Sequence, residues 1–127
     1  MGHNKFKKGP GKFIQLEHWV YDSPAFQSLK PGPRAIYVEL KRQFNGYNNG
    51  NIFLSQRIAG AAANIGRDTV GKYLVELAAK GFIVKTVGHH LGPAGVGQAA
   101  KWALTELPLD GAPATKDFMA WGKQNPR

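Results

Sequence analysis

The sequence predicts an α+β domain in which short helices are followed by a small antiparallel sheet. Apolar residues recur at helical spacing in residues 31–46 and 67–81. A β-branched segment at 82–88 follows, and a glycine-rich stretch separates it from a second strand-like segment at 100–107. The chain has 127 residues, enough for one domain with a modest core and too few for two.

The chain divides into three parts by composition. Residues 1–12 hold four lysines and only Phe6 to bury, which predicts a flexible basic arm. Residues 13–106 are predicted to form the domain, and residues 107–127 a C-terminal tail with a short docking helix. At the start of the domain, apolar and polar residues alternate loosely, which predicts an extended segment containing Ile14, Leu16 and Val20.

Two helices are predicted next. Ser23 is a suitable N-cap for a short helix that begins at Pro24 and runs to Leu29. A longer helix follows within residues 31–46, and Asn45–Gly46 are expected to end it in a left-handed C-cap conformation. Its apolar stripe consists of Ile36, Leu40 and Phe44.

A short strand is predicted at residues 51–55, and two further helices come after it. Ser55 is the expected N-cap of the first, whose buried residues are predicted to be Ile58, Ala59 and Ala62. Gly66 is expected to take a positive φ or a tight turn between the helices. The second helix ends at Gly81 and turns inward Val70, Leu74, Leu77 and Ala78. Two short helices followed by a hairpin form the helix-turn-helix arrangement with a wing.

Gly66, Gly71 and Lys72 also fit the spacing of a phosphate-binding loop. Such a loop needs a buried strand before it and a Ser or Thr after the lysine to ligate magnesium. Here the preceding segment is alanine-rich and helical, and Tyr73 stands at the position of the metal ligand. The stretch is therefore predicted to be a helix, and no nucleotide cofactor is expected.

The formal charge of the chain is +9, which favours a polyanionic partner. Nucleic acid is the expected partner, because no strongly amphipathic basic helix is present to lie on an anionic membrane. The sequence has no cysteine, no long apolar run and no signal peptide, so we expect a cytoplasmic, nucleoid-associated protein without a membrane partner.

The stretch LSQRIAGAAANIGRDTVGKYLVELAAKGFI (residues 54–83) resembles the core of winged helix-turn-helix regulators of the GntR and MarR type. Residues 13–55 resemble small helix-turn-helix proteins of alphaproteobacteria and of their plasmids and phages. The N-terminal halves of these proteins are similar to those of phage replication proteins and plasmid regulators. The resemblance covers residues 13–106. It implies a winged helix-turn-helix with a small antiparallel β-sheet wing, and sequence-specific binding of double-stranded DNA.

The resemblance also implies which residues face DNA, because the N-terminal end of the second helix enters the major groove. These are Arg67, Asp68, Thr69, Gly71 and Lys72. Arg67 is suited to pair with guanine, which contributes about 1–3 kcal/mol of discrimination. Gly71 is expected to permit close approach of the helix to DNA. The alternative is that Arg67 and Lys72 belong to a merely solvated face.

Flanking contacts are predicted at both ends of the motif. The N-terminus of the first helix, with Ser55, Gln56 and Arg57, is suited to hold a phosphate. Wing residues expected to reach phosphates are Lys85 and Lys101. His89 and His90 at the tip are expected to be solvated or phosphate-facing, since adjacent histidines without nearby carboxylates or cysteines make a poor metal site.

Most aromatic residues are expected in the core, namely Phe26, Tyr37, Phe44, Phe53, Phe82 and Trp102. The apolar side of the tail, ATKDFMAW, is expected to dock on its own domain. The alternative is a homodimer that forms through the N-terminal segment and the tail. A dimer would also contact more base pairs than one module, as tight and specific binding requires.

The carboxylates are scattered and no catalytic spacing emerges, so an enzyme is not expected. The predicted function is transcriptional regulation, most simply repression by operator occupancy. Two alternatives stay open. One is a phage or plasmid replication-initiation or maintenance factor that binds DNA, and the other is a winged-helix module that binds an acidic protein.

Overall fold

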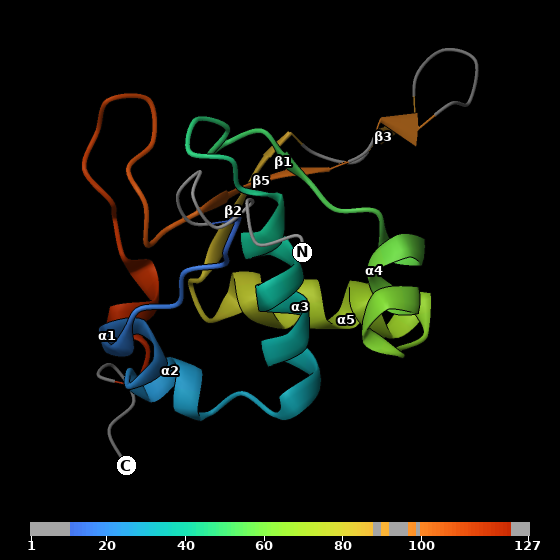
Figure 1. The fold of residues 1–127 in the computed structure, drawn as a ribbon, viewed down its shortest axis with the longest axis horizontal. Coiled ribbons are helices and arrows are strands. Elements are labelled where there is room, and N and C mark those ends of the chain that lie inside the picture. Colours follow the sequence, from blue (N-terminus) through green and yellow to red (C-terminus); the bar gives the residue numbers. More distant parts are fainter. Residues whose placement is uncertain (1–10, 88–89, 92–96, 99, 123–127) are drawn as a thin grey trace, which may run out of the picture.

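A computed structural model describes residues 11–87, 90–91, 97–98 and 100–122, and these form a mixed α+β fold (Figure 1). The helices in these ranges are α1 (His18–Tyr21), α2 (Pro24–Gln27), α3 (Pro31–Gln43), α4 (Gln56–Ala63) and α5 (Arg67–Ala79), with a 3₁₀ turn η2 (Asp117–Ala120). The strands are β1 (Ile52–Phe53), β2 (Ile83–Val87), β3 (His90–Leu91), β4 (Gly97–Gln98) and β5 (Lys101–Leu104). None of these helices has the length and apolar character needed to cross a membrane.

The main sheet is antiparallel, with strand order β1–β5–β2. Strands β2 and β5 are the predicted hairpin, and α5 leads directly into it. The sequence did not indicate that β1 would join the sheet; it pairs with β5 through Ile52 opposite Trp102. Strands β3 and β4 form a separate two-stranded ribbon that lies away from the body of the domain (Figure 1).

Both predicted serine caps are confirmed. The hydroxyl of Ser23 accepts a hydrogen bond from the N–H of Phe26 at 3.2 Å, and that of Ser55 accepts one from Ile58 at the same distance. The extended segment predicted before Ser23 is wrong in its second half. Residues 18–21 form the helical turn α1, which places Val20 in the core.

The end of α3 also differs from the prediction. The helix stops at Gln43, and Phe44 has an extended conformation, so Asn45 and Gly46 do not form a left-handed C-cap. Gly46 does take a positive φ of 100°, but in the loop beyond the helix. The terminal carbonyl of Gln43 is instead satisfied by the side-chain amide of Asn48 at 2.9 Å.

The turn between α4 and α5 is made by a different residue from the one expected. Asn64 takes the left-handed conformation, with φ 60° and ψ 43°, whereas Gly66 has φ −61° and is the N-cap of α5. Asparagine tolerates this conformation, so no glycine is needed there.

The buried face of α4 was predicted incorrectly as well. Ile58 is 61% exposed and Ala62 is exposed, whereas Ala59 and Gly60 are buried. A Cβ atom on Gly60 would lie 2.4 Å from the carbonyl oxygen of Ile65. The small residues therefore allow α4 to approach the start of α5 closely, which turns Ile58 outward.

The core is built around the inner side of α5 and a cluster of aromatic rings. Val70, Leu74 and Leu77 are buried as predicted, and Ala78 is half-buried. The predicted core aromatics are buried or half-buried except Phe53, which is 47% exposed because it points away from its buried neighbour Ile52 in the short edge strand β1.

Residues 117–120 dock on their own domain, as expected. Phe118 is fully buried, and its ring stacks on Phe82 with 4.9 Å between centroids and on Trp19 with 5.7 Å. The tail thus completes the aromatic cluster between the N-terminal segment and the strand that follows α5.

A buried polar network joins α3 to the segment after β5. The carboxylate of Glu106 accepts hydrogen bonds from the hydroxyl of Tyr37 and from the ammonium of Lys41, the latter at 2.8 Å. Burial, and secondarily the charge of Glu106, raise the pKa of Tyr37 well above its ordinary value.

Candidate nucleic-acid interface

A groove of about 620 Å³ lies where the N-terminal end of α4, the first half of α5 and the main sheet meet. We call it the basic groove. Seven of the predicted site residues line it: Ser55, Gln56, Arg57, Arg67, Asp68, Gly71 and Lys85. The remaining lining residues are Phe53, Leu54, Leu74, Val75, Ala100 and Trp102.

The spacing of the apolar residues in α5 places most of the predicted DNA-facing residues on the outer side of the helix. With Val70 and Leu74 turned inward, Arg67, Asp68 and Lys72 are exposed. Asp68 lies in the first turn, where a carboxylate is favoured by the positive end of the helix dipole. Thr69 and Lys72 are not among the residues that line the groove, and Thr69 is half-buried.

Gly71 is the point where α5 approaches the start of α4. A Cβ atom at this position would lie 3.0 Å from the side-chain oxygen of Gln56. The missing side chain therefore leaves room for Gln56 in the basic groove. Close approach of Gly71 to DNA stays a prediction.

The N-terminal end of α4 contributes backbone donors to the same groove. The Ser55 hydroxyl caps the N–H of Ile58, while the first N–H groups of a helix have no carbonyl partner within it. These N–H groups carry the partial positive charge of the helix terminus, and the exposed side chain of Arg57 stands beside them. The N-terminus of α4 is therefore suited to hold an anion.

On the sheet side, Lys85 of β2 is exposed and its ammonium lies 5.5 Å from the centre of the Trp102 ring. This cation–π contact holds the positive charge over β5. Lys101 does not line the groove; it is half-buried on β5, opposite Phe53 and Val87. His89 lies outside the described residues, and so does the side chain of His90, whose backbone belongs to β3.

The charge of the basic groove is positive. Three cationic side chains, Arg57, Arg67 and Lys85, line it against one carboxylate, Asp68. Within the described ranges the only ion pairs are Lys41–Glu106 and Lys80–Glu76, so the cations of the groove are not neutralised there. The groove therefore attracts anions.

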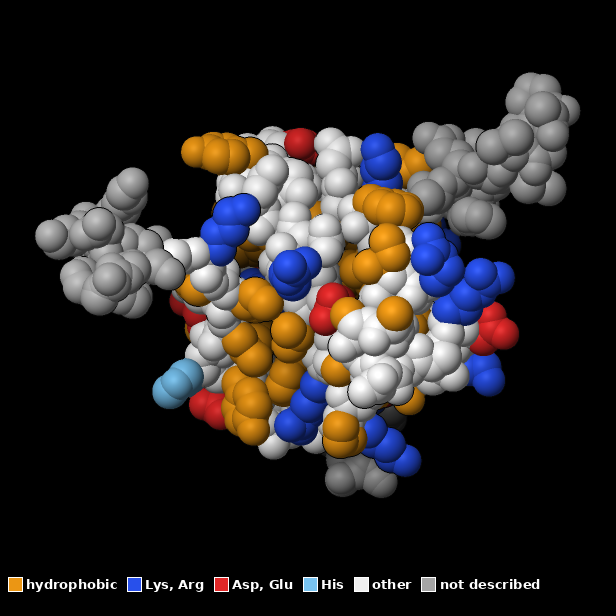
Figure 2. Space-filling view, turned by 45° about the vertical axis from the view of Figure 1, so that its right-hand side comes forward, with side chains coloured by type: hydrophobic (Ala, Val, Ile, Leu, Met, Phe, Trp, Pro, Cys, Tyr) orange, Lys and Arg blue, Asp and Glu red, His pale blue; other side chains and the backbone are white. Residues whose placement is uncertain are grey.

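The groove also contains apolar side chains that the sequence did not indicate. Val75 is 69% exposed and Phe53 is 47% exposed, and Figure 2 shows hydrophobic side chains beside Lys and Arg on this side of the molecule. Val75 follows Arg67 by two helical turns and Gly71 by one, so the helical spacing alone would have placed it on the same face. Phe53 is not in the core as predicted, because side chains alternate along a strand and Ile52 takes the buried side of β1.

Comparisons with protein-family models, with curated proteins and with solved structures found no match. The function is therefore inferred from the geometry and charge of the basic groove.

Proposed function

We propose that this chain is a sequence-specific double-stranded DNA-binding protein with a winged helix-turn-helix fold. In this proposal α4 and α5 are the helix-turn-helix, and β2 and β5 carry the wing. The observation that supports it is the meeting of two helix N-termini and three cations in one groove, with Arg67 at the first position of α5. Among the residues that the structure describes, none of these cations forms an ion pair.

The proposed mode of binding follows from these positions. The exposed N-terminal half of α5 enters the major groove, which is wide enough to admit an α-helix. Arg67 then reaches a guanine edge, while the start of α4 and Arg57 hold a phosphate. Lys85 contacts another phosphate from the sheet. Base contact supplies the specificity, and the phosphate contacts fix the position of the domain.

The proposed role is transcriptional regulation by occupying an operator. A dimer would bind two half-sites about one helical turn apart, which gives tighter and more specific binding than one module. A phage or plasmid replication or maintenance factor would use the same groove. The two roles differ in where the bound sites lie, beside promoters or within an origin.

A protein-interaction module is the second candidate, and the exposed apolar side chains favour it. Phe53 and Val75 line the groove, and Ile58 is exposed on the adjoining helix. An apolar surface rimmed by cations suits an acidic, amphipathic peptide. DNA is preferred because Arg67 and the two helix N-termini provide groups that suit phosphates and guanine.

The test is selection of bound genomic fragments by the full chain, followed by anisotropy titrations of the selected duplex at several salt concentrations. We expect one enriched motif and an affinity that falls with a log–log slope of about −2, since two cations of the groove, Arg57 and Lys85, are proposed to neutralise phosphates. A random fragment pool together with salt-independent affinity would rule out the proposal. The same titration with an acidic peptide would then test the protein-interaction module.

A further inference from the structure

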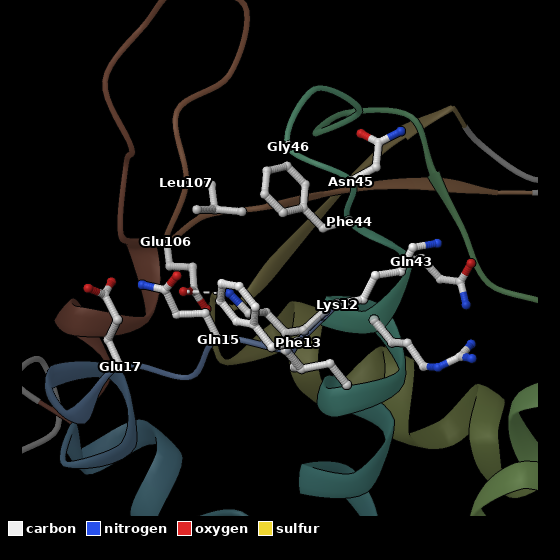
Figure 3. Close-up of a pocket in the computed structure, with 13 residues that line it drawn as sticks. Lys12, Phe13, Gln15, Glu17, Gln43, Phe44, Asn45, Gly46, Glu106 and Leu107 are labelled. Atoms are coloured by element: carbon white, nitrogen blue, oxygen red, sulfur yellow. Dashed lines mark hydrogen bonds and ion pairs between the residues drawn. The ribbon is translucent and has the colours of Figure 1, made fainter. Parts of the chain in front are cut away.

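A second cavity, of about 900 Å³, lies at the C-terminal end of α3, and we call it the Lys41 cavity. Three segments far apart in the sequence line it, and Figure 3 shows how they converge. They are residues 12–15 with Glu17, residues 41–46, and residues 106–107. None of them lines the basic groove.

The buried ion pair belongs to the lining of this cavity. The side chain of Lys41 is 5% exposed and that of Glu106 is 1% exposed. Glu106 is fully engaged, since one oxygen accepts from Lys41 and the other from Tyr37. Lys41 and Glu106 therefore neutralise each other within the lining.

The remaining charges of the lining are unequal. Glu17 accepts a hydrogen bond from the indole N–H of Trp19 at 3.0 Å. Lys12 and Arg42 are exposed, and neither forms an ion pair with any residue that the structure describes. Lys12 and Arg42 thus outnumber the charge of Glu17, and the net charge of the lining is +1, which favours an anionic ligand.

Apolar side chains make up much of the remaining wall. Phe13 is 73% exposed and Ile14 is 40% exposed, while Phe44 and Leu107 are half-buried. Figure 3 shows Phe13, Phe44 and Leu107 in this lining. Two phenyl rings in one lining favour a planar aromatic ligand, because aromatic rings pack well in offset or edge-to-face geometry. A ligand with one charged end and one ring would cover both kinds of surface.

We propose that the Lys41 cavity binds a small aromatic carboxylate, with the carboxylate beside Arg42 and the ring against Phe13 and Phe44. This site is separate from the basic groove and does not depend on DNA binding.

The test is a titration of the isotope-labelled full chain with naphthoate, followed by NMR, with naphthamide as the neutral isostere. We expect saturable shifts of the backbone amides of Gln43, Phe44 and Leu107, and binding of naphthamide that is weaker by about threefold. Arg42→Gln should weaken naphthoate by a similar factor and leave naphthamide unchanged. Arg67→Gln, in the basic groove, should change neither.

Three outcomes would overturn the proposal. One is the absence of saturation at millimolar naphthoate, and another is equal affinity for the acid and the amide. The third is shifts that map to the basic groove and are lost in Arg67→Gln, which would indicate general attraction of anions to a positive protein. A failure of DNA binding would leave all of these readouts unaffected.

Discussion

The ammonium nitrogen of Lys41 lies 2.8 Å from a carboxylate oxygen of Glu106, with both side chains almost completely buried. The pair connects α3 to the segment that follows β5, and the hydroxyl of Tyr37 completes it. A buried charge is tolerated only while its partner is present, because the protein interior solvates ions poorly. Each half of this pair is therefore essential to the other.

Glu106→Gln should lower the free energy of unfolding by about 3–5 kcal/mol, because it leaves the Lys41 ammonium buried without a counter-charge. The amide oxygen of the new glutamine can still accept a hydrogen bond from Tyr37. The loss of stability therefore measures mainly the removal of the negative charge of Glu106. Urea denaturation of the full chain measures it. The double variant Lys41→Met/Glu106→Gln should recover most of the loss.

The half-buried pair Glu76–Lys80 provides the matched control. Its side chains are 34% and 17% exposed, so Glu76→Gln should cost less than about 1 kcal/mol. Equal losses for Glu106→Gln and Glu76→Gln would contradict the assigned role of burial.

Phe118→Ala should destabilise the domain by about 3–5 kcal/mol, since it removes a fully buried ring stacked on Phe82 and Trp19. Thermal and urea denaturation measure the change. Tyr47→Ala is the control, because that side chain is 95% exposed and its loss should stay within about 0.5 kcal/mol. A similarly small effect of Phe118→Ala would show that the tail does not contribute to the core.

Two helical glycines should respond to alanine with opposite signs. At Gly60 the new Cβ would meet the carbonyl oxygen of Ile65 at 2.4 Å, and overpacking against backbone should cost about 1–3 kcal/mol. At Gly71 it would meet only the flexible end of Gln56 at 3.0 Å, so the higher helix propensity of alanine should give up to about 1 kcal/mol of stability. Urea denaturation of both variants measures the two changes in the free energy of unfolding. A Gly60→Ala variant that is more stable than wild type would refute the close approach of α4 to α5.

Arg67→Ala should reduce discrimination between the selected DNA site and a site with its contacted guanine replaced, by about 1–3 kcal/mol. Lys85→Ala should instead weaken all sequences alike and reduce the magnitude of the salt slope by about 1. Anisotropy titrations with both duplexes separate the two effects. If Arg67→Ala loses affinity equally for both duplexes, Arg67 contacts phosphate and another residue reads the bases.

Comparison of wild type with Tyr37→Phe should show that Tyr37 makes the free energy of unfolding depend on pH in the alkaline range. Because the folded-state pKa of Tyr37 is raised, the folded chain retains this proton above about pH 10 while the unfolded chain releases it. The free energy of unfolding of the wild type should therefore exceed that of Tyr37→Phe by a constant amount below about pH 10. This difference should decline as the pH rises further. Urea denaturation of both proteins across this range checks the sign, and a difference that is constant with pH would contradict it.

The features predicted correctly from the sequence depend on local chemistry. The N-caps at Ser23 and Ser55 are side-chain bonds to a backbone N–H three residues away, and the spacing of Val70, Leu74 and Leu77 determines the inner face of α5. The same local spacing places Arg67 outward, so much of the basic groove was predictable.

The features predicted incorrectly depend on how parts of the folded chain pack against one another. The segment around Ala59 and Gly60 is apolar on all sides, so the sequence offers no contrast to show which side is buried. That choice follows from the close contact of Gly60 with Ile65. The Lys41 cavity was not predictable either, because its walls come from three segments that only the folded chain brings together.

The two hollows of this domain have entirely separate linings. Under the two proposals, a carboxylate and a duplex occupy different parts of the surface, so one molecule can bind both at the same time as a ternary complex. Any antagonism between them would have to be transmitted through the protein, and α3, whose Gly32 lies against the ring of Tyr73 on α5, provides a physical route between the two sites.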